Sequence, residues 1–163
     1  IADATVNIEP SSEDLAEIAL LSAEKVRQMD MDPKVAMLSF SNFGGTKHPL
    51  AEKVRRATEI VKSRAPGLVV DGEMQADTAV ESLIMEERYP FSKVKDANVL
   101  VFPSLESANI AYKLLARLGN AKAIGPILLG VGAPVHVLQT GDDVNAIVQI
   151  ASVAVMDVMG REK

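Results

Sequence analysis

The sequence contains no cysteine, no tryptophan and only two histidines, His48 and His136. The missing thiols exclude disulfides, thiolate metal sites and cysteine nucleophiles. Two histidines leave little material for a histidine metal cluster, so no metal is expected in this chain. Aromatic residues make up 4% of the chain, which argues against a stacking platform for bases. No apolar run approaches the length of a membrane-spanning segment, so we expect no membrane partner.

The charge balance is acidic, with 22 Asp and Glu against 17 Lys and Arg and a formal net charge of −5. Such a surface repels phosphate backbones and argues against a nucleic-acid partner. Hydrophobic residues at 48% and charged residues at 24% are typical of globular proteins rather than disordered ones. A chain of 163 residues is long enough to bury a sizeable core as one domain.

The first nine residues alternate apolar and polar side chains from Ile1 onward, which predicts a strand without any lead-in. Domain termini are usually loose, and the first residue is not methionine. We therefore expect a piece cut from a longer chain. No secretory signal pattern is present, so we expect a cytoplasmic location.

Helical and strand patterns alternate along the rest of the chain. Ser11 and Asp14 are spaced as a capping box, which predicts a helix that ends near Pro33. Later patterns predict strands at 35–40, 68–70 and 98–102, helices at about 50–61, 76–89 and 105–118, and short apolar pieces at 127–129 and 135–138. This alternation predicts an α/β fold, a three-layer α/β/α sandwich with a mixed, mostly parallel sheet.

The last predicted helix, from Asp142 to about Met159, has apolar residues on every side. A helix of this kind lies deep in a core or packs against another chain. In a domain of this size we favour a partner surface, and therefore a homo-oligomer that is at least a dimer.

Ligands of open α/β sheets bind at the carboxyl ends of the strands, where the loops are found. The loop Gly44-Gly45-Thr46-Lys47 has the residue types of a phosphate loop in the wrong order, so a nucleoside-triphosphate site is not favoured. His48 is interpreted as a helix N-terminal residue rather than a general base, and His136 as a bonded core histidine rather than a catalyst. The residues alone predict an anion or cofactor cleft.

One acidic cluster leaves an alternative open. Asp71, Glu73 and Asp77 have the oxygen ligands that a hard metal ion prefers. Turn and capping roles explain the same three residues more simply, and we favour those roles.

Several segments together resemble the phosphate acetyl/butyryltransferase family. They are Val-Ala-Met-Leu-Ser-Phe-Ser at 35–41, Asp-Gly-Glu-Met-Gln-Ala-Asp at 71–77, the stretch 101–110, and Ala-Ile-Gly-Pro-Ile at 123–127. The matches follow family order from about residue 1 to 155 and look like the C-terminal half of a phosphotransacetylase. The resemblance implies an isocitrate-dehydrogenase-like fold of which this chain holds one lobe, residues 1–141. The apolar helix, residues 142–163, would then pack on the missing lobe or on a partner subunit.

The chain departs from the family at the catalytic motif. Active members read Pro-Val-Asn-Asp-Leu-Ser-Arg-Gly, whereas residues 134–141 read Pro-Val-His-Val-Leu-Gln-Thr-Gly. The family's serine and arginine fall on Gln139 and Thr140, and its aspartate falls on Ala146. Without the arginine no cation neutralises the phosphate, and without the aspartate the thiol loses its candidate base. No catalytic residue is therefore expected, and neither is acetyl transfer.

These features are similar to the C-terminal domain of bacterial hybrid malic enzymes, which oxidise malate to pyruvate with NADP. The resemblance implies a regulatory domain that binds acetyl-CoA as effector and mediates oligomerisation. NADP and a divalent metal would belong to a catalytic domain elsewhere in the parent chain. The expected ligand-binding residues are Ser41, Asn42, Lys47, Gly125, Pro126, Gln139 and Thr140.

Two alternatives stay open. The chain is an active phosphate acetyltransferase that uses altered residues, or it is a structural dimerisation module with an empty cleft.

Overall fold

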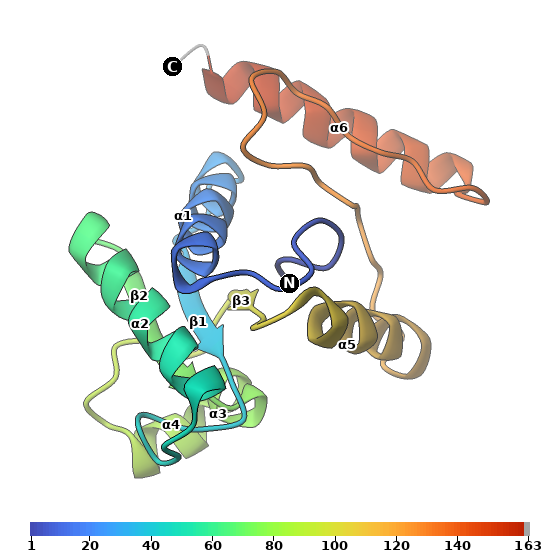
Figure 1. Ribbon diagram of the computed structural model, residues 1–163. Coiled ribbons are helices and arrows are strands. Elements are labelled where there is room, and N and C mark those ends of the chain that lie inside the picture. The colour runs from blue at the N-terminus through green and yellow to red at the C-terminus, as the bar shows by residue number, and fades with distance from the viewer. Residues whose placement is uncertain (162–163) are drawn as a thin grey trace.

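The computed structural model describes residues 1–161 and has three parallel strands in the order β2-β1-β3, with helices on both faces (Figure 1). In chain order the elements are α1 (Ser12–Gln28), β1 (Lys34–Leu38), α2 (Pro49–Arg64), β2 (Val69–Met74), α3 (Ala76–Val80), α4 (Ser82–Arg88), β3 (Val99–Val101), α5 (Leu105–Leu118) and α6 (Val144–Arg161). The α/β class predicted from the sequence is confirmed.

The central strand β1 divides the core into two layers. Val35 and Met37 belong to a buried cluster with residues of α1 and α2. Ala36 and Leu38 point to the other face and join a second cluster that includes Ala79 of α3. Successive side chains of a strand point to opposite faces, so β1 supplies both clusters. The helices α1 and α2, the sheet, and α3 with α4 form the three layers.

The sheet is smaller and more uniform than the sequence predicted. Its three described strands are all parallel, and antiparallel pairing occurs only as an isolated bridge between Ile127 and His136. The short apolar pieces at 127–129 and 135–138 meet at that bridge and form no strand of their own. The predicted mixed sheet is therefore not seen in the described residues.

The predicted N-terminal strand is also wrong. Ala2 makes one bridge to Val101, and the chain then turns away. The carboxylate of Asp3 accepts hydrogen bonds from the backbone N–H groups of Thr5, Val6 and Asn7 at 2.8–3.0 Å. An aspartate side chain that accepts hydrogen bonds from the backbone N–H groups that follow it competes with sheet pairing. Here these hydrogen bonds form in place of the strand that the alternating pattern predicted.

The helix starts follow the sequence signals more closely. Ser11 caps α1 with the full capping box, because its side chain accepts from the Asp14 N–H while the Asp14 carboxylate accepts from the Ser11 N–H. His48 is the N-cap of α2, and its Nδ1 accepts from the Leu50 N–H at 3.2 Å. The helix N-terminal interpretation of His48 is confirmed.

One lysine joins the starts of two helices. Lys53 of α2 donates to the carbonyl oxygens of Pro10 and Pro103 at 3.0 and 2.8 Å. These carbonyls immediately precede the caps of α1 and α5. Burial lowers the pKa of the ammonium, and the nearby charge of Glu9 offsets part of that effect.

The last third of the chain lies to one side of the sheet, with α6 and the segment before it beyond α1 (Figure 1). Ala108 is the buried residue of α5, while Leu114, Leu115 and Leu118 are exposed. In α6 most apolar side chains are exposed as well. The division into units 1–141 and 142–163 remains a prediction, and residues 162 and 163 lie outside the described part of the chain.

Across residues 1–161, no helix combines the length and the apolar character needed to cross a membrane.

Candidate functional site

The loop after β1 is built around a buried carboxylate. The side chain of Glu73 is fully buried at the end of β2. Its Oε1 accepts from the Ser41 hydroxyl at 2.9 Å and from the Gly44 N–H at 2.8 Å. Its Oε2 lies 3.8 Å from Nε of Arg55 on α2, at ion-pair distance, although neither atom makes a hydrogen bond. Glu73 therefore determines the shape of the loop between β1 and α2.

The two predicted ligand residues at the start of this loop are engaged with the protein itself. The Ser41 hydroxyl donates to Glu73 and accepts from the Thr46 N–H at 3.0 Å. The Asn42 amide donates to the Gln75 side chain at 2.9 Å and accepts from the Gln75 N–H at 2.7 Å. Their contacts stiffen the carboxyl edge of the sheet, where sequence reasoning expected a cleft.

Lys47 occupies a different position at the same edge. It is exposed and directly precedes His48, the cap of the 16-residue helix α2. Both the ammonium charge and the helix dipole favour an anion there.

The acidic residues proposed as an alternative metal site do not meet. Asp71 pairs with Lys62 at 2.7 Å, Glu73 is committed to the loop, and Asp77 accepts from the Thr78 N–H at 2.8 Å. No group of three or more potential metal-ligating side chains occurs within residues 1–161. The turn and capping roles favoured from the sequence are wrong for these residues, because Asp71 and Glu73 lie in β2 and Asp77 lies in the first turn of α3, whose N-cap is Gln75.

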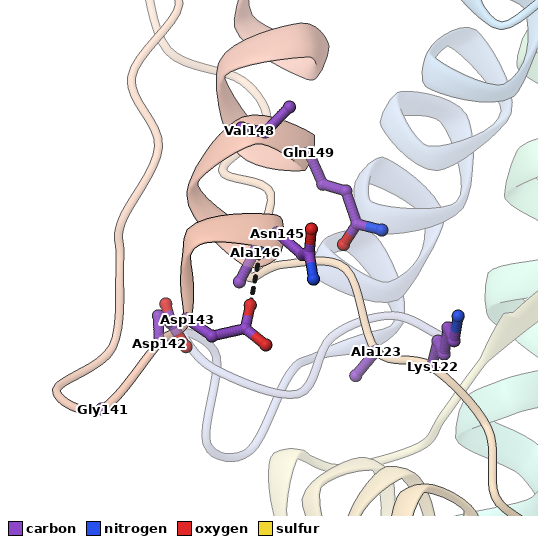
Figure 2. A pocket seen from close by; sticks show the side chains of 9 residues that line it. All are labelled: Lys122, Ala123, Gly141, Asp142, Asp143, Asn145, Ala146, Val148 and Gln149. Atoms are coloured by element: carbon purple, nitrogen blue, oxygen red, sulfur yellow. Dashed lines mark hydrogen bonds between the residues drawn. The ribbon is translucent and has the colours of Figure 1, made fainter.

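A hollow of about 660 Å³ lies at the N-terminal end of α6. Nine residues line it: Lys122, Ala123, Gly141, Asp142, Asp143, Asn145, Ala146, Val148 and Gln149. In Figure 2 the Asn145 and Gln149 side chains extend from α6 toward the side where Lys122 and Ala123 lie. The hollow thus lies between the first turns of α6 and the chain that follows α5.

Backbone contacts hold the acidic residues of the hollow. The carboxylate of Asp142 accepts from the Gln139 N–H at 2.7 Å. The carboxylate of Asp143 accepts from the Ala146 N–H at 2.9 Å, the dashed contact in Figure 2. Since the Asp142 carboxylate accepts from an N–H before the helix and the Asp143 carboxylate from one in its first turn, the uncommitted polar side chains that line the hollow are Asn145, Gln149 and Lys122.

The residues that the family resemblance singled out lie in or beside this hollow. Ala146, the residue on which the resemblance placed the family's aspartate, lines it with a methyl group. Gln139 and Thr140 are exposed and directly precede the lining residue Gly141. Gly125 and Pro126 are half-buried and follow the lining residue Ala123 by two and three positions.

The predicted ligand residues therefore form two groups. Ser41, Asn42 and Lys47 lie in the loop between β1 and α2, near α3 and α4, and the second group lies along the chain that borders α6. Figure 1 shows these regions at opposite ends of the molecule. Within this chain the structure does not bring the two groups together.

Sequence reasoning left five polar residues of the hollow out of the predicted site, namely Lys122, Asp142, Asp143, Asn145 and Gln149. Asn145 and Gln149 are one helical turn apart and flank Ala146, so the helix period around that position could have found them. Lys122 follows the end of α5 in an irregular segment, and its sequence neighbours carry no comparable signal.

Comparison with known proteins identifies the relatives of this fold. The profile described as phosphate acetyl/butaryl transferase matches residues 1–155. The chain belongs to this family. A phosphate acetyltransferase of Bacillus subtilis (strain 168) is 48% identical over 151 residues, covering 92% of this chain and 47% of that protein. An NADP-dependent malic enzyme of Escherichia coli (strain K12) is 46% identical over 160 residues, covering 96% of this chain and 21% of the enzyme.

Solved structures agree with the family assignment. The EutD phosphotransacetylase from Staphylococcus aureus superposes with a TM-score of 0.92 at 39% identity, covering 96% of this chain and 49% of that one. A phosphotransacetylase from Streptococcus pyogenes also gives a TM-score of 0.92, at 44% identity, with 99% and 49% covered. The chain thus spans about half the length of these phosphotransacetylases and about a fifth of the malic enzyme.

Proposed function

We propose that this chain is a regulatory phosphotransacetylase-like domain of an NADP-dependent malic enzyme. In this proposal it binds acetyl-CoA as an allosteric effector, transfers no acetyl group and helps to assemble the oligomer. NADP and the divalent metal belong to a catalytic domain in the same parent chain, which converts malate to pyruvate and CO2 in the cytoplasm. The similarity to both malic enzymes and phosphate acetyltransferases is compatible with this assignment, and the residues around the hollow support a domain without acetyl transfer.

The observation that carries the proposal is the character of the hollow at α6. Where the family's aspartate is expected, Ala146 contributes a methyl group, which cannot accept a proton from a thiol. Gln139 and Thr140 replace the serine and arginine, so the phosphate and the developing oxyanion lose their cationic partner. Neutral amides still suit a thioester carbonyl, which needs hydrogen-bond donors and no charge.

Regulation follows from differential binding. An effector shifts an assembly only if it binds one arrangement more tightly than another. The hollow adjoins the helix whose apolar side chains are exposed in this chain. A ligand at the start of α6 is therefore well placed to alter how α6 meets a partner.

Calorimetric titration of the parent enzyme with acetyl-CoA tests the binding. We expect saturable heat in the wild type, and weaker binding by about tenfold when Gln149→Leu removes one amide of the hollow. Val148→Ala serves as the matched control, since it changes a neighbouring lining residue without removing a polar group. Absence of heat at millimolar acetyl-CoA would overturn the proposal in favour of a purely structural dimerisation module.

The second candidate is an active phosphate acetyltransferase. It is favoured by one observation, the Asp142 and Asp143 carboxylates at the hollow, either of which is a potential base if it releases its backbone N–H. Release of free coenzyme A from acetyl-CoA and phosphate, detected with a thiol reagent, distinguishes the two. Turnover above background in the wild type, lost in Asp143→Asn, would establish the transferase.

A restoring variant sharpens this assay. Gln139→Ser, Thr140→Arg and Ala146→Asp together rebuild the family's catalytic residues in the same frame. If these replacements are the reason for inactivity, the triple variant in the parent enzyme gains measurable acetyl transfer. If the wild type already turns over and the triple variant is no faster, the argument from Ala146 is wrong.

A further inference from the structure

The helix α6 contacts the rest of the described chain through a narrow stripe. Its buried side chains are Ile150, Val153 and Asp157, spaced three and four residues apart on one face. Two of these are apolar and the third is a carboxylate. Because so few apolar groups are involved, apolar packing does little to fix the position of α6 along a neighbouring helix.

Asp157 fixes the position of α6 through contacts of both its carboxylate oxygens. Its Oδ1 forms a buried ion pair with Nζ of Lys25 on α1, and its Oδ2 lies 2.9 Å from Nε2 of His136. The three side chains are 10%, 7% and 3% exposed. Because a carboxylate oxygen accepts hydrogen bonds, His136 completes the cluster as a donor through Nε2. This bonding agrees with the interpretation of His136 as a core histidine, with Nδ1 left buried and without a hydrogen bond.

The surface of α1 that receives this cluster is continuous. Leu21, Lys25 and Gln28 follow one another on a single face of α1. A Cβ added to Gly130 would lie 3.1 Å from Leu21, and one added to Gly160 would lie 3.4 Å from Gln28. The turn before residues 134–138 and the end of α6 thus approach α1 closely on either side of Lys25.

We infer that Asp157 is a positioning residue: its carboxylate, held by Lys25 and His136, sets the register in which α6 and residues 134–141 dock on α1. A buried pair often adds little net stability over apolar residues of the same shape, but an unpaired buried charge is strongly unfavourable. Any sliding of α6 along α1 would leave Lys25 without its counter-charge. The cluster therefore makes other registers of α6 on α1 unfavourable. In this way it fixes the position of the hollow at the other end of α6.

Hydrogen exchange of the full 163-residue chain tests this inference without any ligand, so its outcome is independent of acetyl-CoA binding. Asp157→Asn leaves Lys25 buried without a counter-charge. We expect amides of α6 and of residues 134–141 to exchange on the order of 100-fold faster, while those of β1 and α2 stay within about twofold. Glu24→Gln is the control, because it removes an exposed charge next to Lys25 and should change neither region.

A second variant separates positioning from simple loss of a buried contact. Lys25→Met combined with Asp157→Leu removes both charges at similar volume, and we expect it to recover most of the α6 protection that Asp157→Asn loses. Unchanged α6 exchange in Asp157→Asn would overturn the inference. So would faster exchange throughout the chain with no recovery in the paired variant.

Discussion

Glu73 places a negative charge in a fully buried position and shares it among three groups. Ser41 and Gly44 donate to one oxygen, and Arg55 faces the other. The partners come from a loop and a helix that are remote from Glu73 in sequence. A buried carboxylate of this kind is stable only while all its partners are in place. If one side of a contact is removed, the polar group on the other side is left buried and unsatisfied.

Replacing this carboxylate should therefore be costly. We expect Glu73→Ala to lower the free energy of unfolding by about 3 kcal/mol, because it removes the acceptor of the Ser41 hydroxyl and the Gly44 N–H and the buried counter-charge that faces Nε of Arg55. Urea denaturation followed by circular dichroism measures the change. Glu52→Gln is the matched control, since Glu52 pairs with the same Arg55 but is 66% exposed, and it should cost under about 0.5 kcal/mol. Equal effects of the two variants would contradict this account.

Asp3 provides a prediction for pH. Burial by itself would raise the pKa of Asp3, but the hydrogen bonds from the backbone of Thr5, Asn7 and Val6 and from the Asn7 side chain together lower it below 3.8. The folded state therefore favours the ionised carboxyl. Its stabilisation is present above the ordinary pKa and is lost as the pH falls through the lower folded value.

The corresponding variant is Asp3→Asn. We expect it to unfold at a lower temperature than the wild type near neutral pH, by an amount equivalent to about 1 kcal/mol. The difference between the two proteins should shrink as the pH falls below the ordinary pKa of an aspartate and should vanish once Asp3 is protonated in both states. Thermal denaturation scans across this range measure it, and a difference that does not depend on pH would show that the charge is irrelevant.

At the scale of elements, α1 contributes both to the buried core and to the surface on which α6 docks. One face packs Leu15, Ala19 and Ala23 against the sheet, and another receives α6. Its N-terminal capping box sets where these faces begin. Loss of the cap frays the first turn and weakens both sets of contacts.

We accordingly expect Ser11→Ala to lower the free energy of unfolding by about 1 kcal/mol, with α1 amides of the first turn exchanging fastest. Ser63→Ala, at an exposed position of α2, removes the same hydroxyl where no cap is involved and should be nearly neutral. Chemical denaturation gives the energies. An effect of Ser63→Ala as large as that of Ser11→Ala would argue against capping as the cause.

The elements also show what sequence could and could not reveal. The capping box at Ser11, the apolar run of β1 and the cap at His48 are local signals, and the helices and strands follow them. The N-terminal strand failed because one side chain, Asp3, redirected the backbone. Period alone does not anticipate a hydrogen bond of that kind.

The candidate site was less accessible to prediction. The pairing of Ser41 with Glu73 spans 32 residues, and its geometry depends on β1 and β2 lying side by side. The motif comparison pointed to Ala146 and so to the hollow, whereas Lys122 comes to it only through the path of the chain after α5. Contacts of this type are properties of the tertiary fold, and neither composition nor spacing encodes them locally.

At the scale of the whole molecule, the last third presents much apolar surface to solvent. Val155 and Val158 of α6 are 57% and 48% exposed, and Leu118 of α5 is 80% exposed. Surfaces of this kind commonly mark sites where another protein surface packs. The oligomerisation predicted from the sequence would cover them.

Charged substitutions on α6 test that prediction. We expect the combined variant Val155→Lys and Val158→Lys to dissociate the oligomer, because two lysines cannot be buried without partners. Sedimentation velocity over a concentration series measures the mass. Val6→Lys, at an N-terminal residue that is equally exposed, should leave the mass unchanged. A wild type that sediments as a monomer at all concentrations would refute the prediction.

The distribution of the core along the chain has a consequence for how the protein is made. Both buried apolar clusters are drawn from residues 15 to 101. β1 pairs first with β2, which is nearby in sequence, and then with β3, so the sheet is complete once β3 has left the ribosome. The body can therefore fold during synthesis while α5 and α6 are still unmade. Lys25 would stay without its partner in the folded body until Asp157, 132 residues further along the chain, has been synthesised.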